Sequence, residues 1–240
     1  MEIRDELRIF ERTYLSITHI VAATHFARLS VSLEADDTRI FLSPGRFSED
    51  WLFEHNAYVT ASILSTVAFL EAVINELFSD ALDNHWGEIE RLDATARLSL
   101  ADMWKKVKDD RRVSTLEKYQ HALEATHKEK FKEGNSPFQP AKAVINLRNT
   151  LVHYVPKTRE SPTAEATELE FLTDLEKYLK GKFDPSPLYR KSSEPFFPAR
   201  CLSAGCARWV VTNGLTFTDA FFSKLGLTAS YDGVRSRLAI

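Results

Sequence analysis

The sequence predicts an all-α protein, and three observations indicate this fold class. Apolar residues recur with the 3.6-residue period of a helix in several long segments, and no segment shows the alternation of a half-buried strand. Only 8 Gly and 9 Pro interrupt the 240 residues, which disfavours an all-β protein with many tight turns. We expect one elaborated helical domain over residues 1–240. Its core is a bundle over 48–155, preceded by N-terminal helices in 1–47 and followed by a helical extension over 156–240.

The N-terminal segment is expected to form one or two helices from residue 3 to about residue 34. One apolar stripe recurs there at helical spacing: Phe10, Tyr14, Ile17 and Val21. A loop is expected over 36–45, because Pro44 and Gly45 break regular structure.

The strongest helical pattern runs from about Ser48 to Leu82, a segment without Gly or Pro. Ser48 suits the N-cap, and Glu49 and Asp50 in the first turn complement the helix dipole. About 35 residues at a rise of 1.5 Å span about 50 Å, so this helix forms the spine of the bundle or is kinked. Its most apolar part, 61–78, also carries polar and acidic residues, so we expect a buried helix and no membrane span.

Further helices are expected at 94–107 and 114–131, with a polar turn between them, and at about 139–154. Pro140 suits the first turn of the third helix, and Pro156 stops it.

The C-terminal part is expected to begin with a helix at 165–180 and an extended, Pro-rich linker at 182–199. The last helix spans about 201–225, with a bend near Gly214 and a cap at Gly226. The pattern after Gly226 gives no clear assignment.

Composition and motifs exclude several function classes. A net charge of −3 and a pI near 6.2 provide no bulk positive field for nucleic acid or anionic lipid. The two cysteines, Cys201 and Cys206, suit a reducing cytosol and cannot form a disulfide scaffold. The first residues alternate charges and lack the apolar core of a secretory signal. No HExxH, Walker loop or GxGxxG is present. We expect a cytoplasmic protein without a metal or cofactor.

Positive charge is concentrated between residues 97 and 132, which contain ten Lys or Arg and six Asp or Glu. Five cations cluster near the expected turn between two helices: Lys105, Lys106, Lys108, Arg111 and Arg112. Such a cluster is usually the solvated face of surface helices. The functional alternative is a patch that binds the phosphates of RNA.

The residues best suited to chemistry lie in the expected helix at 139–154. Arg148 and His153 are about 140° apart on an ideal helix, so both reach one cleft only if Arg148 extends across the helix face. Asn149 and His153 are four residues apart and share a face, where the Asn149 amide could hold the imidazole or a phosphate.

This segment resembles the signature of the HEPN superfamily, in which Arg is followed by a polar residue, often Asn, and by His after four to six intervening residues. The long helix before it is similar to the core helix of HEPN bundles, in which an acidic residue, here Glu71, packs toward the motif. The resemblance covers roughly 48–155. Some toxin members carry Tyr two residues after the His; here Tyr154 comes one residue early, about 100° away around the helix. The role of the family's Tyr is therefore not carried over, and Tyr154 is expected only as a supporting residue of the site.

The resemblance implies a metal-independent endoribonuclease. His153 would act as general base on the ribose 2′-OH or as acid to the leaving 5′-oxygen, and Arg148 would stabilise the charged phosphorane. It also implies a two-fold homodimer in which helix 139–154 and part of helix 48–82 bring two motifs into one cleft. RNA is then the substrate. An antitoxin or another regulatory protein is a further expected partner, because prokaryotic relatives often serve in toxin–antitoxin or phage-defence systems.

Structural alternatives remain open for each of these residues. His153 could simply stabilise the last helical turn, where the dipole favours a cation. Arg148 could form a structural ion pair with Glu71 or Glu76. A looser match, Arg12 followed by His19, satisfies the spacing without the Asn. The whole domain could be a non-catalytic helical module that binds RNA, a nucleotide or a protein.

Overall fold

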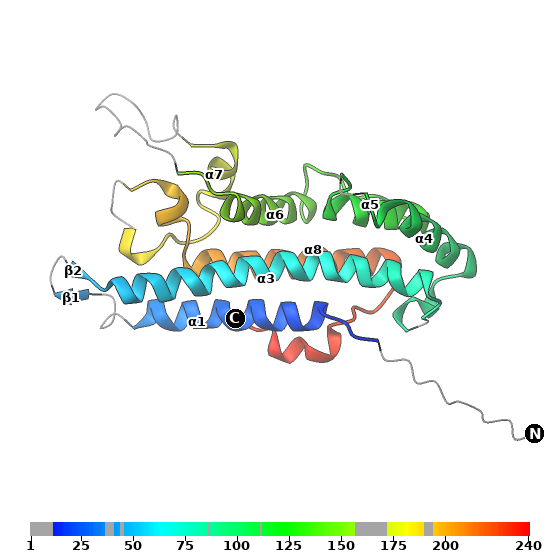
Figure 1. The fold of residues 1–240 in the computed structure, drawn as a ribbon, viewed down its shortest axis with the longest axis horizontal. Helices are drawn as coiled ribbons and strands as arrows, with labels where there is room; N and C mark the ends of the chain where they lie inside the picture. Colours follow the sequence, from blue (N-terminus) through cyan, green and yellow to red (C-terminus); the bar gives the residue numbers. More distant parts are fainter. Residues whose placement is uncertain are drawn as a thin grey trace, which may run out of the picture.

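The computed structural model describes residues 12–36, 41–43, 46–85, 87–110, 112–156, 172–189 and 194–240. Within these residues all regular secondary structure is helical except for one short antiparallel hairpin, which confirms the all-α fold class (Figure 1). The expected helical residues 3–11 and 165–171 lie outside the described residues.

Three long helices form the body of the molecule, and α3 lies at its centre. α1 (Ser16–Ala35), α3 (Glu49–Leu82) and α8 (Ala204–Leu225) lie side by side. A row of shorter helices, α4 (Ala94–Val107), α5 (Thr115–Ala125) and α6 (Phe138–Val152), follows α3 along its length (Figure 1). The C-terminal helix α8 is thus part of the bundle core and packs directly on α1, α3 and α6.

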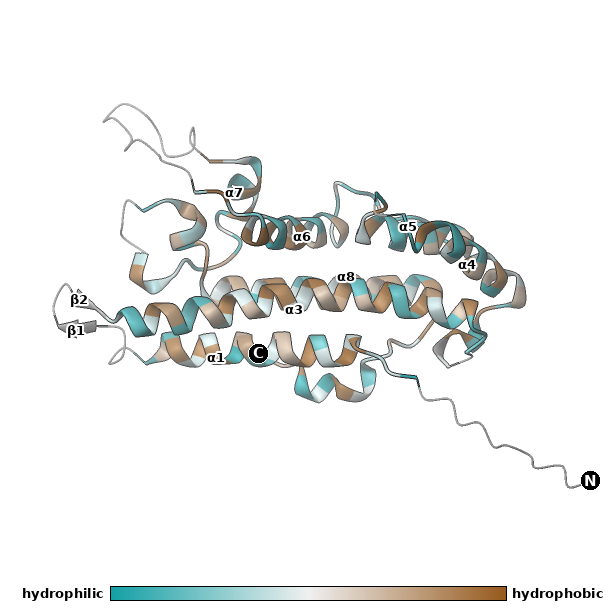
Figure 2. Cartoon of the chain, in the orientation of Figure 1, coloured by the Kyte–Doolittle hydropathy of each residue, from teal (hydrophilic) through white to brown (hydrophobic). Residues whose placement is uncertain are grey.

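α3 is the uninterrupted spine that the sequence predicts. The Ser48 hydroxyl accepts a hydrogen bond from the backbone N–H of Trp51 at 3.1 Å, and Glu49 and Asp50 occupy the first turn. Figure 2 shows hydrophobic residues along most of α3, and those that face α1 and α8 are buried. By length and composition alone α3 could cross a membrane. Half of its most apolar window is buried in the bundle.

A close approach between α8 and α3 explains the glycine in the middle of the last helix. A Cβ added at Gly214 would lie 2.7 Å from the Cγ2 methyl of Thr66. The helix runs through Gly214 without interruption, so this glycine permits contact between helices. At the end of α8, Gly226 takes a left-handed φ of 72° and caps the helix as predicted.

Three expected elements differ from the structure. The helix predicted at 114–131 is α5, which ends at Ala125; His127 follows with φ of 55°, a conformation that cannot continue a right-handed helix. The side chain of Gln120 then bonds both backbone groups of Phe131, at 2.9 and 2.8 Å, and holds the chain in a non-helical path. The expected loop at 36–45 contains the first strand of a hairpin, β1 (Phe41–Ser43) with β2 (Arg46–Phe47).

The segment predicted as an extended linker contains short helical turns. These are η3 (Pro187–Tyr189) and η4 (Phe196–Arg200), and only α7 (Asp174–Leu179) is described from the helix expected before them. A further 3-10 turn, η1 (Glu88–Arg91), precedes α4, and another, η5 (Asp232–Arg237), lies in the tail. Arg28 of α1 anchors that tail, because its guanidinium donates to the carbonyls of Arg237 and Ala239 at 2.6 and 2.7 Å.

Candidate active site

α6 is fixed to the core by one face and presents the motif at its C-terminal end. Ala141, Val144 and Leu147 recur at three-residue spacing, and all three are fully buried. Pro140 lies in the first turn, where its missing N–H costs no hydrogen bond. The last α-helical hydrogen bond runs from the N–H of His153 to the carbonyl of Asn149 at 2.9 Å. The predicted helix at 139–154 is therefore present with its ends shifted by one or two residues.

His153 is exposed at the point where α6 ends. Its backbone closes the last turn, but its side chain makes no hydrogen bond or ion pair within the described residues. The imidazole is therefore accessible to a substrate. The expected hydrogen bond from the side chain of Asn149 to this imidazole is not formed in the described structure, which leaves the half-buried amide for other partners.

Arg148 is half-buried, and the carboxylates proposed as its structural partners are used elsewhere. Glu71 lies 3.5 Å from Lys118 of α5. One oxygen of Glu76 accepts hydrogen bonds from the backbone N–H groups of Leu15 and Ser16, at 2.8 and 2.9 Å, at the start of α1. The ion pair of Arg148 with Glu71 or Glu76 is thus absent from the described structure, and Glu71 does not support the motif by hydrogen bonding.

The second match to the spacing has a structural role. Arg12 lies 2.9 Å from a carboxylate oxygen of Asp80 and 2.9 Å from one of Asp83. Those two acids lie at the end of α3, so Arg12 holds the segment before α1 against that helix. A guanidinium with two carboxylate partners is unavailable to a phosphate, which separates Arg12 from Arg148.

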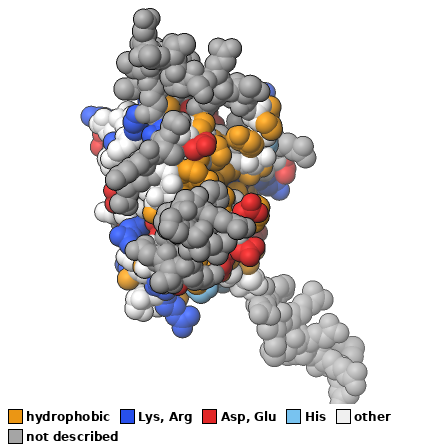
Figure 3. All heavy atoms as spheres, turned by 90° about the vertical axis from the view of Figure 1, so that its left-hand side faces the viewer, with side chains coloured by type: hydrophobic (Ala, Val, Ile, Leu, Met, Phe, Trp, Pro, Cys, Tyr) orange, Lys and Arg blue, Asp and Glu red, His pale blue; other side chains and the backbone are white. Residues whose placement is uncertain are grey.

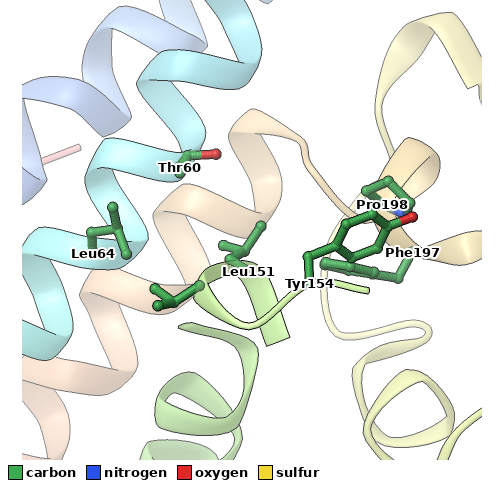
Figure 4. Close-up of a pocket in the computed structure, with 7 residues that line it drawn as sticks. Thr60, Leu64, Leu151, Tyr154, Phe197 and Pro198 are labelled. Carbon is green, nitrogen blue, oxygen red and sulfur yellow. The ribbon is translucent and has the colours of Figure 1, made fainter. Parts of the chain in front are cut away.

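A pocket of about 380 Å³ opens beside the end of α6. Its walls come from three elements: Thr60 and Leu64 of α3, Leu151, Val152 and Tyr154 at the end of α6, and Phe197 and Pro198 of η4. Figure 4 shows the Tyr154 ring beside Phe197, with Leu64 and Thr60 on the opposite wall. The centroids of the two aromatic rings are 6.0 Å apart at 54°. His153 lies between two lining residues in the chain.

Sequence reasoning found only part of this pocket. Tyr154 was predicted as a supporting residue, and the structure places its ring in the wall. Thr60, Leu64, Phe197 and Pro198 were not predicted as site residues. The available signal was the Phe-Phe-Pro run in a Pro-rich segment, which is typical of a folded turn as well as of a linker.

Comparison with known proteins adds no assignment. No family model, curated protein or solved structure matches the chain. The HEPN resemblance therefore stays a prediction from the sequence motif.

The basic cluster lies away from this pocket and is partly neutralised. Lys105 pairs with Asp102 at 3.0 Å, and Arg112 makes two bonds to Asp110 at 3.0 and 2.9 Å. These bonds from Arg112 lower the pKa of Asp110. Lys106 and Lys108 are exposed, and Arg111 lies outside the described residues.

The distance between the basic cluster and the pocket can be estimated along α3. The turn that carries it leads into α5, where Lys118 donates to Asn75 at 3.0 Å. The pocket instead lies beside Leu64. Eleven residues of helix separate Asn75 from Leu64, about 16 Å of rise. One nucleotide cannot contact both places, so RNA would have to extend along the molecule.

The described residues contain no group of three or more His, Cys, Asp or Glu placed to hold a metal ion. Cys201 and Cys206 are fully buried free thiols. Burial, followed by a hydrogen bond with Cys201, raises the pKa of Cys206, so this thiol stays protonated and is a poor nucleophile.

Proposed function

We propose that the protein is a metal-independent endoribonuclease of the HEPN type that acts on cytoplasmic RNA. One observation carries the proposal: a half-buried Arg148 without a carboxylate partner among the described residues and an exposed His153 end the same helix beside an open pocket. An unpaired guanidinium suits a phosphate, and an exposed imidazole suits proton transfer near neutral pH.

The reaction follows from these two groups. A neutral imidazole accepts the proton of the ribose 2′-OH, and the 2′-oxygen attacks the adjacent phosphorus. Arg148 stabilises the negative charge that develops on the phosphorane oxygens. The bond from phosphorus to the 5′-oxygen then breaks, and an imidazolium protonates the leaving oxygen. The products are a 2′,3′-cyclic phosphate and a 5′-hydroxyl.

A base and an acid are both required, yet each chain offers one histidine at the site. A two-fold homodimer supplies the second His153, and its interface uses the same surface on both copies. The end of α6 provides apolar surface for such an interface, because Val152 and Val155 are 54% and 68% exposed. A regulatory protein, such as an antitoxin, would act by covering the same end.

Cleavage of single-stranded RNA in the presence of EDTA tests this proposal. We expect wild-type protein to cleave and His153→Ala to lose about 10²–10⁴-fold in rate while keeping its melting temperature. His19→Ala is the matched control, since His19 belongs to the second spacing match and should have no effect.

The alternative function is a non-catalytic helical module that binds RNA, a nucleotide or a protein. The mainly apolar lining of the pocket favours it, because such a lining can bind a ligand without any chemistry. Absence of EDTA-resistant cleavage on varied RNAs, with any copurifying partner removed, would favour this alternative over the nuclease.

A further inference from the structure

We propose that the pocket beside the end of α6 binds one unpaired nucleobase of the RNA, next to the phosphate that Arg148 contacts. This inference rests on the proposed ribonuclease function and adds a substrate class to it: single-stranded RNA with a base turned out of its stack.

The shape and lining of the pocket fit a flat aromatic group. Its volume of about 380 Å³ is near the lower end of the roughly 300–1,000 Å³ found for small-molecule sites. Aliphatic side chains from α3 and α6 form one side, and the rings of Tyr154 and Phe197 form the other (Figure 4). Phe197 is 8% exposed, so its ring is held in place, while Tyr154 is 49% exposed and offers a face to a ligand. Aromatic rings of this kind bind bases by stacking.

The position of Arg148 links the pocket to a phosphate. Arg148 lies three and four residues before Leu151 and Val152, both of which line the pocket, so the three side chains share one face of α6. The backbone of Arg148 lies about 6 Å, four residues of rise, along the helix axis from that of Val152. A nucleotide combines an apolar, planar base with an anionic phosphate, which matches an apolar pocket next to a cation.

The hydroxyls of the pocket suit a base more than they suit an apolar side chain of another protein. Thr60 and Tyr154 are the lining residues that carry a hydroxyl, a group that can bond the edge of a base. Figure 3 shows this end of the molecule, where hydrophobic side chains gather in one area with both acidic and basic side chains around it.

A duplex cannot place a base in this pocket without losing a base pair, so paired RNA is expected to be a poor ligand. Because every base has an aromatic face, stacking alone accepts all four. Selection among bases would come from the two hydroxyls.

Nuclear magnetic resonance on the full chain tests the inference without requiring cleavage. The probes are the four nucleoside 3′-monophosphates, with ribose phosphate as the ligand that lacks a base. We expect the nucleotides to shift the methyl signals of Leu64, Leu151 and Val152, and ribose phosphate to leave them unchanged.

Two variants sharpen the assignment. Leu64→Trp fills the pocket from α3, whereas Leu98→Trp places the same ring on an exposed leucine of α4 outside it. We expect Leu64→Trp and Tyr154→Ala to weaken binding of a short single-stranded RNA by about tenfold. Leu98→Trp should bind as wild type, and Tyr154→Phe should keep most of the affinity because the ring remains.

The outcomes separate this inference from the proposed nuclease. Cleavage without nucleotide-induced shifts in the pocket overturns the base site and leaves the nuclease proposal standing. Shifts in the absence of cleavage support the base site and contradict the nuclease. The dimer proposed above would itself shift the Val152 methyls with protein concentration, so the Leu64 methyls on α3 are the readout for this outcome. Leu64 shifts that depend on protein concentration without nucleotide would mean that a second copy occupies the pocket, which also overturns the base site.

Discussion

Arg148 is half-buried and has no carboxylate partner among the described residues. Arg12, by comparison, contacts two carboxylates. A guanidinium without an anionic partner is available to a phosphate, which it can bind through two parallel hydrogen bonds. This residue is therefore the most direct test of the site at the residue scale.

Arg148→Ala is expected to lower the rate of RNA cleavage by about 10²–10³-fold, through lost stabilisation of the phosphorane. Arg148→Lys should recover only part of the rate, because lysine keeps the charge and loses the bidentate geometry. Thermal unfolding is the control. A loss of stability in Arg148→Ala matching the loss of activity would mean that Arg148 has a structural role.

At the residue scale, the candidate catalytic side chains are easier to predict from the sequence than the residues that line the pocket. Arg148, Asn149 and His153 lie within six residues, so their spacing alone places them on one helix end. Leu64 and Phe197 are 133 residues apart in the sequence. They line the same pocket only because the fold brings α3 and η4 to the end of α6. Such tertiary proximity leaves no local pattern in the sequence.

At the scale of the elements, the contact of α8 with α3 is the place where one added methyl group should most affect stability. Gly214→Ala is expected to destabilise the protein by about 1–3 kcal/mol, because the new Cβ overlaps the methyl of Thr66 at 2.7 Å. Thr66 is buried and β-branched, so its side chain has little freedom to move away. Chemical denaturation measures the change in the free energy of unfolding.

Two further variants isolate this overlap. Gly233→Ala should have little effect, since nothing lies within 4 Å of a Cβ added there. In the double variant with Thr66→Ser the methyl is removed and the hydroxyl bonded to the Ser62 carbonyl is kept. We expect this double variant to recover most of the free energy of unfolding that Gly214→Ala loses. A double variant as unstable as Gly214→Ala would contradict the overlap as the cause.

The basic cluster contains cations that are paired with local acids and cations for which no such pair is seen among the described residues, and the two kinds can be compared in RNA binding. If the end of α4 guides RNA, replacing exposed Lys106 and Lys108 by Ser should lower the slope of log affinity against log salt by about 0.7 for each lost contact. Lys105→Ser with Arg112→Ser should change it less, because both cations are already paired with local acids. An unchanged slope for the first pair identifies the cluster as a solvated helix face.

Element boundaries show where sequence patterns are sufficient and where they are not. α4 begins and ends at the predicted residues, since Asp93 caps its first turn by accepting from the N–H of Ala96 at 2.8 Å. α5 is shorter than its charge and apolar pattern predicts. After its end, the side chain of Gln120 bonds the backbone of Phe131 and holds the chain in a non-helical path, and an interaction across eleven residues has no periodic signature.

At the scale of the whole molecule, one hydrophobic core joins residues from all parts of the chain. Ile20 near the N-terminus, Ile74 in α3 and Tyr231 in the tail belong to the same buried cluster. The sequence predicts a core over 48–155 with flanking extensions, whereas the structure builds α1 and α8 into that core. Their amphipathic patterns indicate helices but do not show which helices they contact.

The dimer is the remaining expectation at this scale, and it can be separated from the nucleobase pocket. Val155 is 68% exposed and does not line the pocket, so Val155→Glu places a charge on the apolar surface near the site without blocking a base. If two copies meet at the end of α6, this variant should shift a dimer to a monomer in light scattering at micromolar concentration. Leu98→Glu, an equally exposed site on α4, is the control.

Cleavage by that monomer then decides how the site is assembled. Each monomer retains Arg148, His153 and the pocket, so its binding of nucleoside 3′-monophosphates should be unchanged. Its cleavage rate should fall, because one imidazole cannot act as base and acid on opposite sides of the phosphorus in the same step. A monomeric variant that cleaves at the wild-type rate would contradict the composite site and show that one chain supplies both proton transfers.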